Sequence, residues 1–339
     1  MNNSHISSLQ DFFSTKKKIV IVSHSNPDGD ALGSSLALYN YFLLKNQEVI
    51  IIVPNNFPDY LAWMKGSDKI LLYSSKKNTC DQLIENADVL FCLDFNALKR
   101  VDKVEDSLRK TKALKVLIDH HLQPELNAFD YAFSETKVSS TSELIYDFIV
   151  AMGDEKLMNI DISSCIYVGI MTDTGSFSYS CNYEKTYQIS ASLLKTGMDA
   201  EEIHHLVYDT FSENRLRLLG YCLSEKLVVN AELSAAYISL SKEELNRFSY
   251  QVGDTEGVVN YALSINQVKL AALFSEREGK IRISFRSKGE VDVNVFARTY
   301  FEGGGHRNAS GATSYLSLNE TIKKFEESLL EYRLQLNLK

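Results

Sequence analysis

The sequence is poor in the features that mark disordered, secreted or membrane-spanning chains. It contains only four prolines among 339 residues, and no low-complexity run indicates disorder. The apolar stretch at residues 32–44 is interrupted by polar groups and is too short to cross a bilayer. Residues 1–18 lack the apolar core and small-residue cleavage site of a secretory signal. We therefore expect a cytoplasmic protein without a membrane partner.

Cysteine is also sparse, and its pattern excludes two kinds of site. The five cysteines are an odd, scattered set without a CxxC pair: Cys80, Cys92, Cys165, Cys181 and Cys222. A disulfide framework or a zinc–thiolate site would need paired or clustered cysteines. Cys92 and Cys165 lie inside apolar runs, which is typical of small buried side chains.

Positive charge is in short supply. The chain has 36 Lys and Arg residues against 44 Asp and Glu residues, and its formal net charge is −8. This argues against a protein that binds long duplex nucleic acid by neutralising its phosphates. It does not exclude a small anionic substrate, because a local basic pocket can bind one.

The first half of the chain alternates short apolar runs with helical patterns. Strands are expected at residues 18–24, 48–53, 88–94 and 115–119, and helical patterns at residues 30–45, 101–110, 142–152 and 160–171. Strands that alternate with helices at this spacing predict an α/β fold, with a mostly parallel sheet covered by helices on both faces.

The pattern changes after Gly175. Helices are expected at residues 184–195, 200–223 and 318–336, with a break at Gly197, and strands at residues 235–240, 268–275 and 280–287. The sequence therefore predicts an N-terminal domain over residues 1–196, a helical linker over 197–228, and a smaller C-terminal α/β domain over 229–339.

Histidine and aspartate residues follow three of the predicted strands. They are His24, Asp28 and Asp30 after one strand, Asp94 after another, and Asp119, His120 and His121 after a third. Asp173 follows another apolar run. Because ligands in an open α/β sheet gather beyond the carboxyl ends of its strands, we expect these side chains to meet at one edge.

Mixed imidazole and carboxylate ligands suit divalent ions such as Mn²⁺, whereas structural zinc favours cysteine. Four carboxylates and two histidines are too many for one ion and enough for two that share a bridging acid. Two ions about 3.5–4 Å apart can activate water and neutralise both oxygens of a phosphoryl displacement. Mn²⁺ is the expected ion, with Mg²⁺ or Co²⁺ as alternatives.

Each of these residues also has an ordinary interpretation. An aspartate that ends a strand, such as Asp94, is commonly a turn former, and Asp30 could cap the helix that follows it. We interpret the adjacent His204 and His205 as polar surface. The ordinary interpretations must all hold at once to account for the whole set, and this favours the metal site.

Two motifs resemble those of a known family. The segment HSNPDGDALGS at residues 24–34, together with DHH at residues 119–121, resembles the DHH phosphoesterase superfamily. The segment GGGHRNASG at residues 303–311 is similar to the signature of the accompanying DHHA1 domain. The resemblance covers essentially the whole chain. Length and domain order are similar to the short members that act as oligoribonucleases (nanoRNases) and 3′-phosphoadenosine 5′-phosphate (pAp) phosphatases.

The resemblance implies roles for individual residues. It implies one ion bound by His24, Asp28 and Asp94, and a second bound by Asp30, Asp94, His120 and Asp173, with Asp94 bridging. It also implies that Asp119 orients a histidine and that His121 contacts the phosphate. Implied substrate contacts in the second domain are Arg286, Ser287, Gly303, Gly304, Gly305 and His306. Consecutive glycines would let the backbone approach a phosphate closely.

The resemblance thus implies a two-metal phosphoesterase that hydrolyses short single-stranded RNA oligonucleotides to mononucleotides and dephosphorylates pAp. Phe95 stands where relatives often carry a small hydroxyl residue, which puts substrate size in doubt. Three alternatives stay open: a phosphodiesterase for linear dinucleotides, a pyrophosphatase or exopolyphosphatase, and a non-catalytic nucleotide sensor. The sequence leaves the oligomeric state open, and a homodimer is compatible with it.

Overall fold

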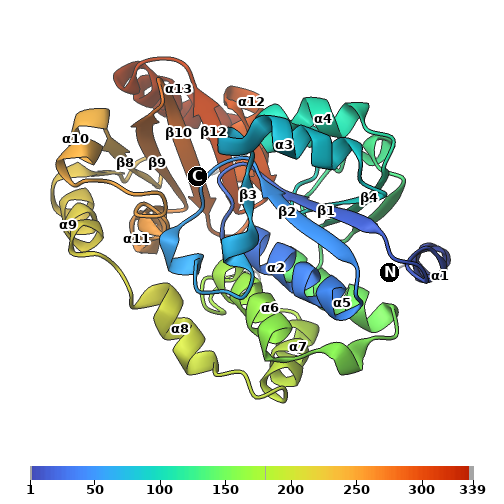
Figure 1. The fold of residues 1–339 in the computed structure, drawn as a ribbon. Coiled ribbons are helices and arrows are strands. Elements are labelled where there is room, and N and C mark those ends of the chain that lie inside the picture. Colours follow the sequence, from blue (N-terminus) through green and yellow to red (C-terminus); the bar gives the residue numbers. More distant parts are fainter. Residues whose placement is uncertain (1, 180, 336–339) are drawn as a thin grey trace. The chain divides into compact units, whose positions relative to one another are not determined.

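The computed structural model describes residues 2–179 and 181–335. The chain divides into two compact units, Met1–Thr210 and Phe211–Lys339 (Figure 1). The division falls inside the segment 197–228 that the sequence analysis assigned to a linker. Each unit is described by itself.

Unit 1 is built on a six-stranded sheet with the order β3-β2-β1-β4-β5-β6. The strands are β1 (Lys18–Ser23), β2 (Glu48–Val53), β3 (Leu71–Leu72), β4 (Val89–Leu93), β5 (Leu114–Asp119) and β6 (Tyr131–Ser134). All neighbouring strands run parallel, which confirms the predicted sheet. In this register Ile21 pairs with Ile51 on one side and Phe91 on the other.

Helices cover both faces of this sheet (Figure 1). The helices of unit 1 are α1 (Asn3–Phe12), α2 (Gly29–Leu44), α3 (Tyr73–Glu85), α4 (Glu105–Lys110), α5 (Thr141–Ala151), α6 (Ile160–Asp173), α7 (Glu184–Leu194) and α8 (Ala200–Tyr208). Short 3-10 turns occupy Asp59–Leu61, Ser67–Lys69, Leu98–Val104 (η3), Leu126–Ala128 and Glu155–Leu157.

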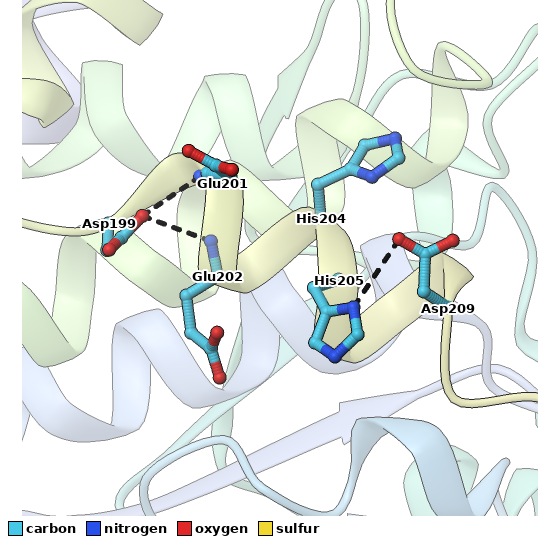
Figure 2. A pocket seen from close by; sticks show the side chains of 6 residues that line it. All are labelled: Asp199, Glu201, Glu202, His204, His205 and Asp209. Atoms are coloured by element: carbon cyan, nitrogen blue, oxygen red, sulfur yellow. Dashed lines mark hydrogen bonds and ion pairs between the residues drawn. The ribbon is translucent and has the colours of Figure 1, made fainter.

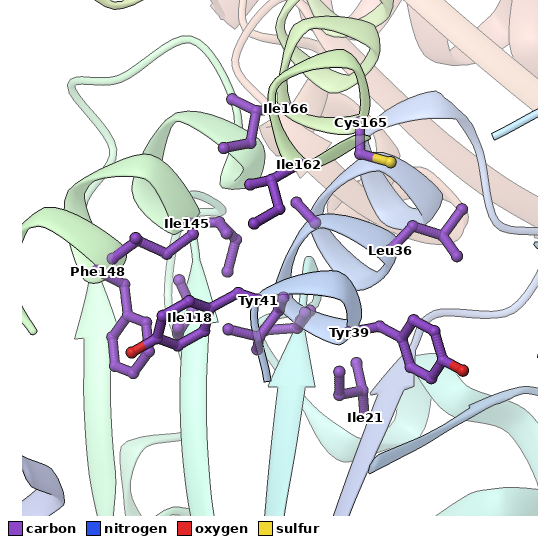
Figure 3. Packing of buried hydrophobic residues seen from close by; sticks show 14 of the residues in the cluster. Ile21, Leu36, Tyr39, Tyr41, Ile118, Ile145, Phe148, Ile162, Cys165 and Ile166 are labelled. Atoms are coloured by element: carbon purple, nitrogen blue, oxygen red, sulfur yellow. The ribbon is translucent and has the colours of Figure 1, made fainter. Parts of the chain in front are cut away.

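Alternate residues of each strand enter different cores. Ile21 and Ile118 pack with Leu36 of α2, Phe148 of α5 and Ile162 of α6 in one cluster (Figure 3). The intervening strand residues pack against α3, η3 and α4 in a second cluster. Each fully buried large apolar side chain stabilises the fold by about 1.5–3 kcal/mol. The strands, and with them the residues at their ends, are therefore held in place by well-packed cores on both faces of the sheet.

The strand order creates a switch point between β1 and β4. From β1 the chain moves outward through β2 to β3, and it then returns to form β4 on the opposite side of β1 before continuing to β5 and β6. In open α/β sheets the crevice for ligands lies beyond the carboxyl ends of the strands at such a point. The residues that follow β1 and β4 are His24 and Asp94.

Unit 2 contains a second six-stranded sheet with the order β11-β12-β10-β9-β8-β7. Its strands are β7 (Leu227–Asn230), β8 (Ala235–Leu240), β9 (Leu270–Arg277), β10 (Lys280–Ser287), β11 (Glu302–His306) and β12 (Ala309–Ser314). Its helices are α9 (Glu213–Tyr221), the π-helical turn Cys222–Lys226, α10 (Lys242–Arg247), α11 (Val258–Ser264), α12 (Val293–Tyr300) and α13 (Leu318–Gln335). Strands β8 and β9 are parallel and the other pairs antiparallel.

Two apolar clusters flank this second sheet. Phe285 of β10 packs with Phe296 of α12 and Phe325 of α13 on one face. The opposite face carries a cluster that contains Leu218 of α9 and Val259 of α11. The result is the expected smaller α/β region in the C-terminal part of the chain.

Two sequence expectations are wrong. The helix expected at 200–223 is interrupted, because Ser212 starts a new helix by accepting a hydrogen bond from the Arg215 amide at 3.1 Å. The glycine run at residues 303–305, which lies outside the strands expected from the sequence, is part of strand β11 and pairs with β12. A Cβ on Gly303 would lie 2.5 Å from the Gly311 carbonyl oxygen, so this close pairing requires glycine. Residue 336, the last of the expected terminal helix, lies outside the described residues.

No helix within residues 2–179 and 181–335 combines the length and apolar character needed to cross a membrane.

Candidate metal centre

Strand and helix ends bring the predicted ligands of unit 1 together. His24 follows β1, Asp28 and Asp30 begin α2, Asp94 follows β4, His120 follows β5, and Asp173 ends α6. Two sets of three ligand atoms each lie within 4.8 Å of one another: His24 with Asp28 and Asp94, and Asp30 with Asp94 and His120. Asp94 belongs to both sets.

Asp94 lies at the centre of the cluster. Its Oδ2 is 3.3 Å from His24 Nε2, and its Oδ1 is 3.5 Å from His120 Nε2. The residue is only 2% exposed. Its φ of +63° lies in the left-handed region, which costs a non-glycine residue roughly 1 kcal/mol. The backbone holds this conformation partly through the Asp94 amide, which donates to the Ile118 carbonyl at 3.1 Å.

The rings of the two predicted histidine ligands are oriented toward the acids. His24 Nδ1 lies 3.0 Å from the Ser25 carbonyl oxygen. A carbonyl can only accept, so Nδ1 carries the proton and Nε2 faces Asp94. His120 Nε2 lies 3.3 Å from Asp173 Oδ2 and 3.7 Å from Asp30 Oδ2. Asp173 thereby joins the cluster from the end of α6.

The helix cap of α2 is Asp28 rather than Asp30. Asp28 Oδ1 accepts hydrogen bonds from the Asp30 amide at 3.1 Å and the Ala31 amide at 3.0 Å. The same oxygen lies 3.8 Å from His24 Nε2. The ordinary interpretation of Asp30 as a cap is therefore wrong, and its side chain is buried beside Asp94 and His120.

Charges within the cluster shift the pKa values in opposite directions. Burial, together with the Asp94 and Asp173 carboxylates, raises the pKa of Asp30 well above its usual value. Burial opposes ionisation of Asp94 too, but hydrogen bonds with His120 and His24 hold its pKa well below the usual range. Burial would lower the pKa of His120, yet Asp173 and Asp94 raise it to about 10.

His121 and Asp119 form a buried pair beside the cluster. His121 Nδ1 lies 2.7 Å from Asp119 Oδ1, and the His121 amide donates to Asp119 Oδ2 at 3.1 Å. Burial and the Arg100 guanidinium hold the pKa of His121 well below its ordinary value. Burial raises the pKa of Asp119 to about 6. At neutral pH a neutral His121 therefore donates through Nδ1 to an ionised Asp119.

The donor set fits divalent cations. It consists of imidazole nitrogens and carboxylate oxygens, the ligands that Mn²⁺ and similar ions accept. Asp30 and Asp94 are 1% and 2% exposed, and their mutual repulsion contributes to the raised pKa of Asp30. A cation between them would remove that repulsion. The residues present thus match the group that the resemblance implies.

Comparison with known proteins identifies the family. Residues 18–170 match the DHH family, N-terminal domain, and residues 233–331 match the DHHA1 domain. A probable bifunctional oligoribonuclease and PAP phosphatase NrnA from Streptococcus mutans is 31% identical over 318 residues, which cover 92% of this chain and 95% of the relative. The chain belongs to the DHH family.

Other similar proteins agree with this membership. The bifunctional oligoribonuclease and PAP phosphatase NrnA from Bacillus subtilis is 29% identical, with 88% of this chain and 89% of the relative covered. The crystal structure of an exopolyphosphatase-related protein from Bacteroides fragilis is 45% identical with a TM-score of 0.92, covering 99% of this chain and 98% of that chain. As a DHH-family member, the chain is a phosphoesterase that depends on divalent metal ions.

In the DHHA1 domain, the structure separates the predicted substrate residues by face. Arg286 of β10 pairs with Ala309 of β12, which pairs with His306 of β11, so Arg286 and His306 lie on the same face of the sheet. Ser287 lies on the other face and is 7% exposed. Its hydroxyl donates to the Val291 carbonyl at 2.6 Å and accepts from Asn308 at 2.9 Å.

Sequence reasoning missed two residues near the cluster of predicted metal ligands. Arg100 lies in η3, where its carbonyl accepts from the Ser25 amide at 2.9 Å, and its guanidinium acts electrostatically on His24, Asp119 and His121. Thr141 begins α5 and donates its hydroxyl to Asp94 Oδ1 at 2.9 Å. Neither lies in a motif that marks chemistry, so only the fold reveals their positions.

Phe95 does not face the cluster of predicted metal ligands. It is completely buried, and it packs with Cys92, Leu98 and Val101 in the core on the α3 and α4 side of the sheet. The doubt that Phe95 raised about substrate size therefore loses its basis, because this ring fills the core.

A surface pocket on unit 1 is a separate feature. Its lining residues all come from α8 and its flanks: Asp199, Glu201, Glu202, His204, His205 and Asp209 (Figure 2). His205 Nδ1 lies 3.5 Å from Asp209 Oδ2, and both side chains are more than half exposed. None of the predicted metal ligands lines this pocket, and the exposure of His205 agrees with its interpretation as polar surface.

Proposed function

We propose that the chain hydrolyses short RNA oligonucleotides to mononucleotides and removes the 3′-phosphate of pAp at one centre that holds two metal ions. The observation that carries the proposal is the position of Asp94, which lies within reach of two separate ligand sets. The two similar proteins named NrnA support this substrate class, because their names state both activities.

The proposed ligand sets follow the geometry of unit 1. One ion is bound by His24, Asp28 and Asp94, and the other by Asp30, Asp94, His120 and Asp173. We propose Mn²⁺ as the ion, because imidazole and carboxylate ligands together suit it. When bound, two such ions supply charge neutralisation and water activation for phosphoryl displacement.

We propose that His121 contacts the scissile phosphate and that Asp119 orients His121. Their 2.7 Å contact fixes the His121 proton on Nδ1, so Nε2 is the nitrogen that His121 can present to substrate. A neutral imidazole in that position can accept a proton or a hydrogen bond from the reacting group. Asp119 keeps the ring in this tautomer and orientation.

We also assign Arg100 to the same phosphate. The charge of its guanidinium acts on both His24 and His121, and the residue is half-buried. A guanidinium in such a position can bind a phosphate through two parallel hydrogen bonds. It would raise the affinity for substrates that carry a phosphate at the centre, whatever their length.

In the DHHA1 domain we propose Arg286, His306 and Gly303–Gly305 as contacts to the part of the substrate away from the scissile phosphate. Arg286 and His306 share one face of the sheet, which supports a common ligand. The buried hydrogen bonds of Ser287 favour a role in holding the turn that joins β10 to α12 instead. We keep residues 1–196, 197–228 and 229–339 as the proposed catalytic, linker and substrate-binding segments.

We further infer a cytoplasmic location. All five cysteines are unpaired and buried, and unpaired thiols persist in a reducing compartment.

A substrate panel tests the function. Very short RNA oligomers, pAp, a linear dinucleotide and pyrophosphate are assayed side by side with Mn²⁺. We expect turnover of the RNA oligomers and pAp. Rapid turnover of pyrophosphate alone would reject the proposal in favour of a pyrophosphatase, and nucleotide binding without turnover of any substrate would reject it in favour of a sensor.

A further inference from the structure

The first residue of α5 contacts two of the proposed metal ligands at once. The Thr141 amide donates to Asp30 Oδ2 at 2.6 Å, and the Thr141 hydroxyl donates to Asp94 Oδ1 at 2.9 Å. The Ser142 amide completes the contact by donating to Asp30 Oδ1 at 2.8 Å. Asp30 lies in the first turn of α2 and Asp94 follows β4, so Thr141 connects two acids that are far apart in the sequence.

These hydrogen bonds lie in a dry environment. Thr141 is completely buried, and Asp30 and Asp94 are 1% and 2% exposed. A hydrogen bond to a charged group contributes about 1.5–3 kcal/mol, more than one between neutral groups. The N-terminus of α5 also points its partial positive charge at the Asp30 carboxylate. Both effects hold the two carboxylates against their mutual repulsion.

The same hydrogen bonds leave the acids able to bind metal. Each carboxylate oxygen has two acceptor positions. The Thr141 hydroxyl occupies one position on Asp94 Oδ1, and an amide occupies one position on each oxygen of Asp30. A second acceptor position on each oxygen can then face a cation.

We propose that Thr141 is a positioning residue that sets the separation and orientation of Asp30 and Asp94, two of the carboxylates that are proposed to bind the second ion. This inference rests on the proposed metal centre. Residues that orient metal ligands in this way change metal affinity or activity by about 10–100-fold when they are removed. Thr141 acts through the carboxylates and does not itself contact substrate.

The chain offers a matched control in Thr186. Its hydroxyl donates to Glu143 Oε2 at 2.8 Å, and both residues are completely buried. Thr186→Val thus removes the same kind of buried threonine–carboxylate hydrogen bond as Thr141→Val. The difference is that Glu143 is not a proposed metal ligand.

The experiment titrates the wild-type protein, Thr141→Val, Thr141→Ser and Thr186→Val with Mn²⁺ by calorimetry and measures the melting temperature of each metal-free protein. Both valine variants should lose stability to a similar extent. Only Thr141→Val should bind its weaker Mn²⁺ ion about 10–100-fold less tightly, with a fall in kcat and little change in KM. Thr141→Ser, which keeps the hydroxyl, should restore wild-type affinity.

Two results would overturn the inference. Thr141→Val could bind both ions as the wild type does, or Thr141→Ser could lose affinity as strongly as Thr141→Val, which would show that the hydroxyl is not the cause. A wild-type protein that binds no Mn²⁺ would instead defeat the proposed metal centre, so the two failures are distinguishable.

Discussion

Replacing Asp94 with asparagine should abolish every activity of the chain together. The substitution keeps the shape of the side chain and an oxygen that can accept from Thr141, but it removes the negative charge. Asp94 contacts His24 at 3.3 Å and His120 at 3.5 Å, and both contacts lose their ionic character. Because Asp94 belongs to both ligand sets, no other single substitution affects both ions so directly.

The size of the effect follows from the position of Asp94. Loss of a residue that merely orients a ligand costs about 10–100-fold in affinity or activity, so loss of the shared ligand should cost at least about 100-fold in Mn²⁺ affinity at one site. In the metal-free protein the two histidines lose a buried carboxylate partner. They can release their protons in response, so the stability cost should be about 1–3 kcal/mol.

A matched control comes from Asp154. This carboxylate accepts hydrogen bonds from the Tyr41 hydroxyl at 2.7 Å and Lys45 at 2.8 Å, and its side chain is only 14% exposed. Asp154→Asn should destabilise the protein to a similar degree without changing Mn²⁺ stoichiometry or activity. Calorimetry with Mn²⁺ and the substrate panel measure both variants. The reasoning is refuted if Asp94→Asn keeps activity on one substrate, because the activities would then use different centres.

Three further predictions concern neighbouring groups. Arg100→Gln should raise KM about 10–100-fold for each phosphate substrate, as expected for a lost charged hydrogen bond, and an unchanged KM in steady-state assays would contradict its assignment. The rise in melting temperature caused by Mn²⁺ should be larger near pH 9 than near pH 7. In the metal-free folded protein the pKa of His120 is about 10, against 6.5 in the unfolded chain, so the stability that its proton contributes is lost as the pH rises from 6.5 to 10. A bound ion requires the neutral ring at either pH, so the metal-bound protein does not lose this contribution. A rise in melting temperature that is smaller at pH 9 than at pH 7 would count against this. Phe95→Leu should lower the free energy of unfolding by about 1–2 kcal/mol through a core cavity and leave the order of substrate preference unchanged, and a reordered panel would show that the ring reaches the substrate.

The clustering of the candidate metal ligands could be predicted from the sequence because these residues follow a rule about strand ends. His24, Asp94 and His120 each come directly after a strand built on an apolar run, and parallel strands carry their carboxyl ends to one edge. The strands β1, β2, β4 and β5 could also be predicted from the sequence. Their residues are buried on both faces, so they form continuous apolar runs.

Other features have no such local signal. Thr141 reaches Asp30 across 111 positions and Asp94 across 47 positions of the chain, so its contacts exist only once the sheet has formed. Strand β11 is EGGGH, a composition that favours a loop by itself. It becomes a strand because Gly303 fits closely against β12 where any side chain would collide. In both cases tertiary contacts decide what the local sequence does not.

Strand order explains why one aspartate, rather than another, occupies the shared position. β4 lies between β1 and β5 in the sheet, so the residue that follows β4 has the end of β1 on one side and the end of β5 on the other. His24 and His120 follow those two neighbours, and Asp94 is the residue between them. Its left-handed backbone, with φ of +63°, turns the chain directly after Leu93 and keeps the carboxylate at the edge of the sheet. The strain at Asp94 is thus the local cost of placing one carboxylate within reach of both histidines.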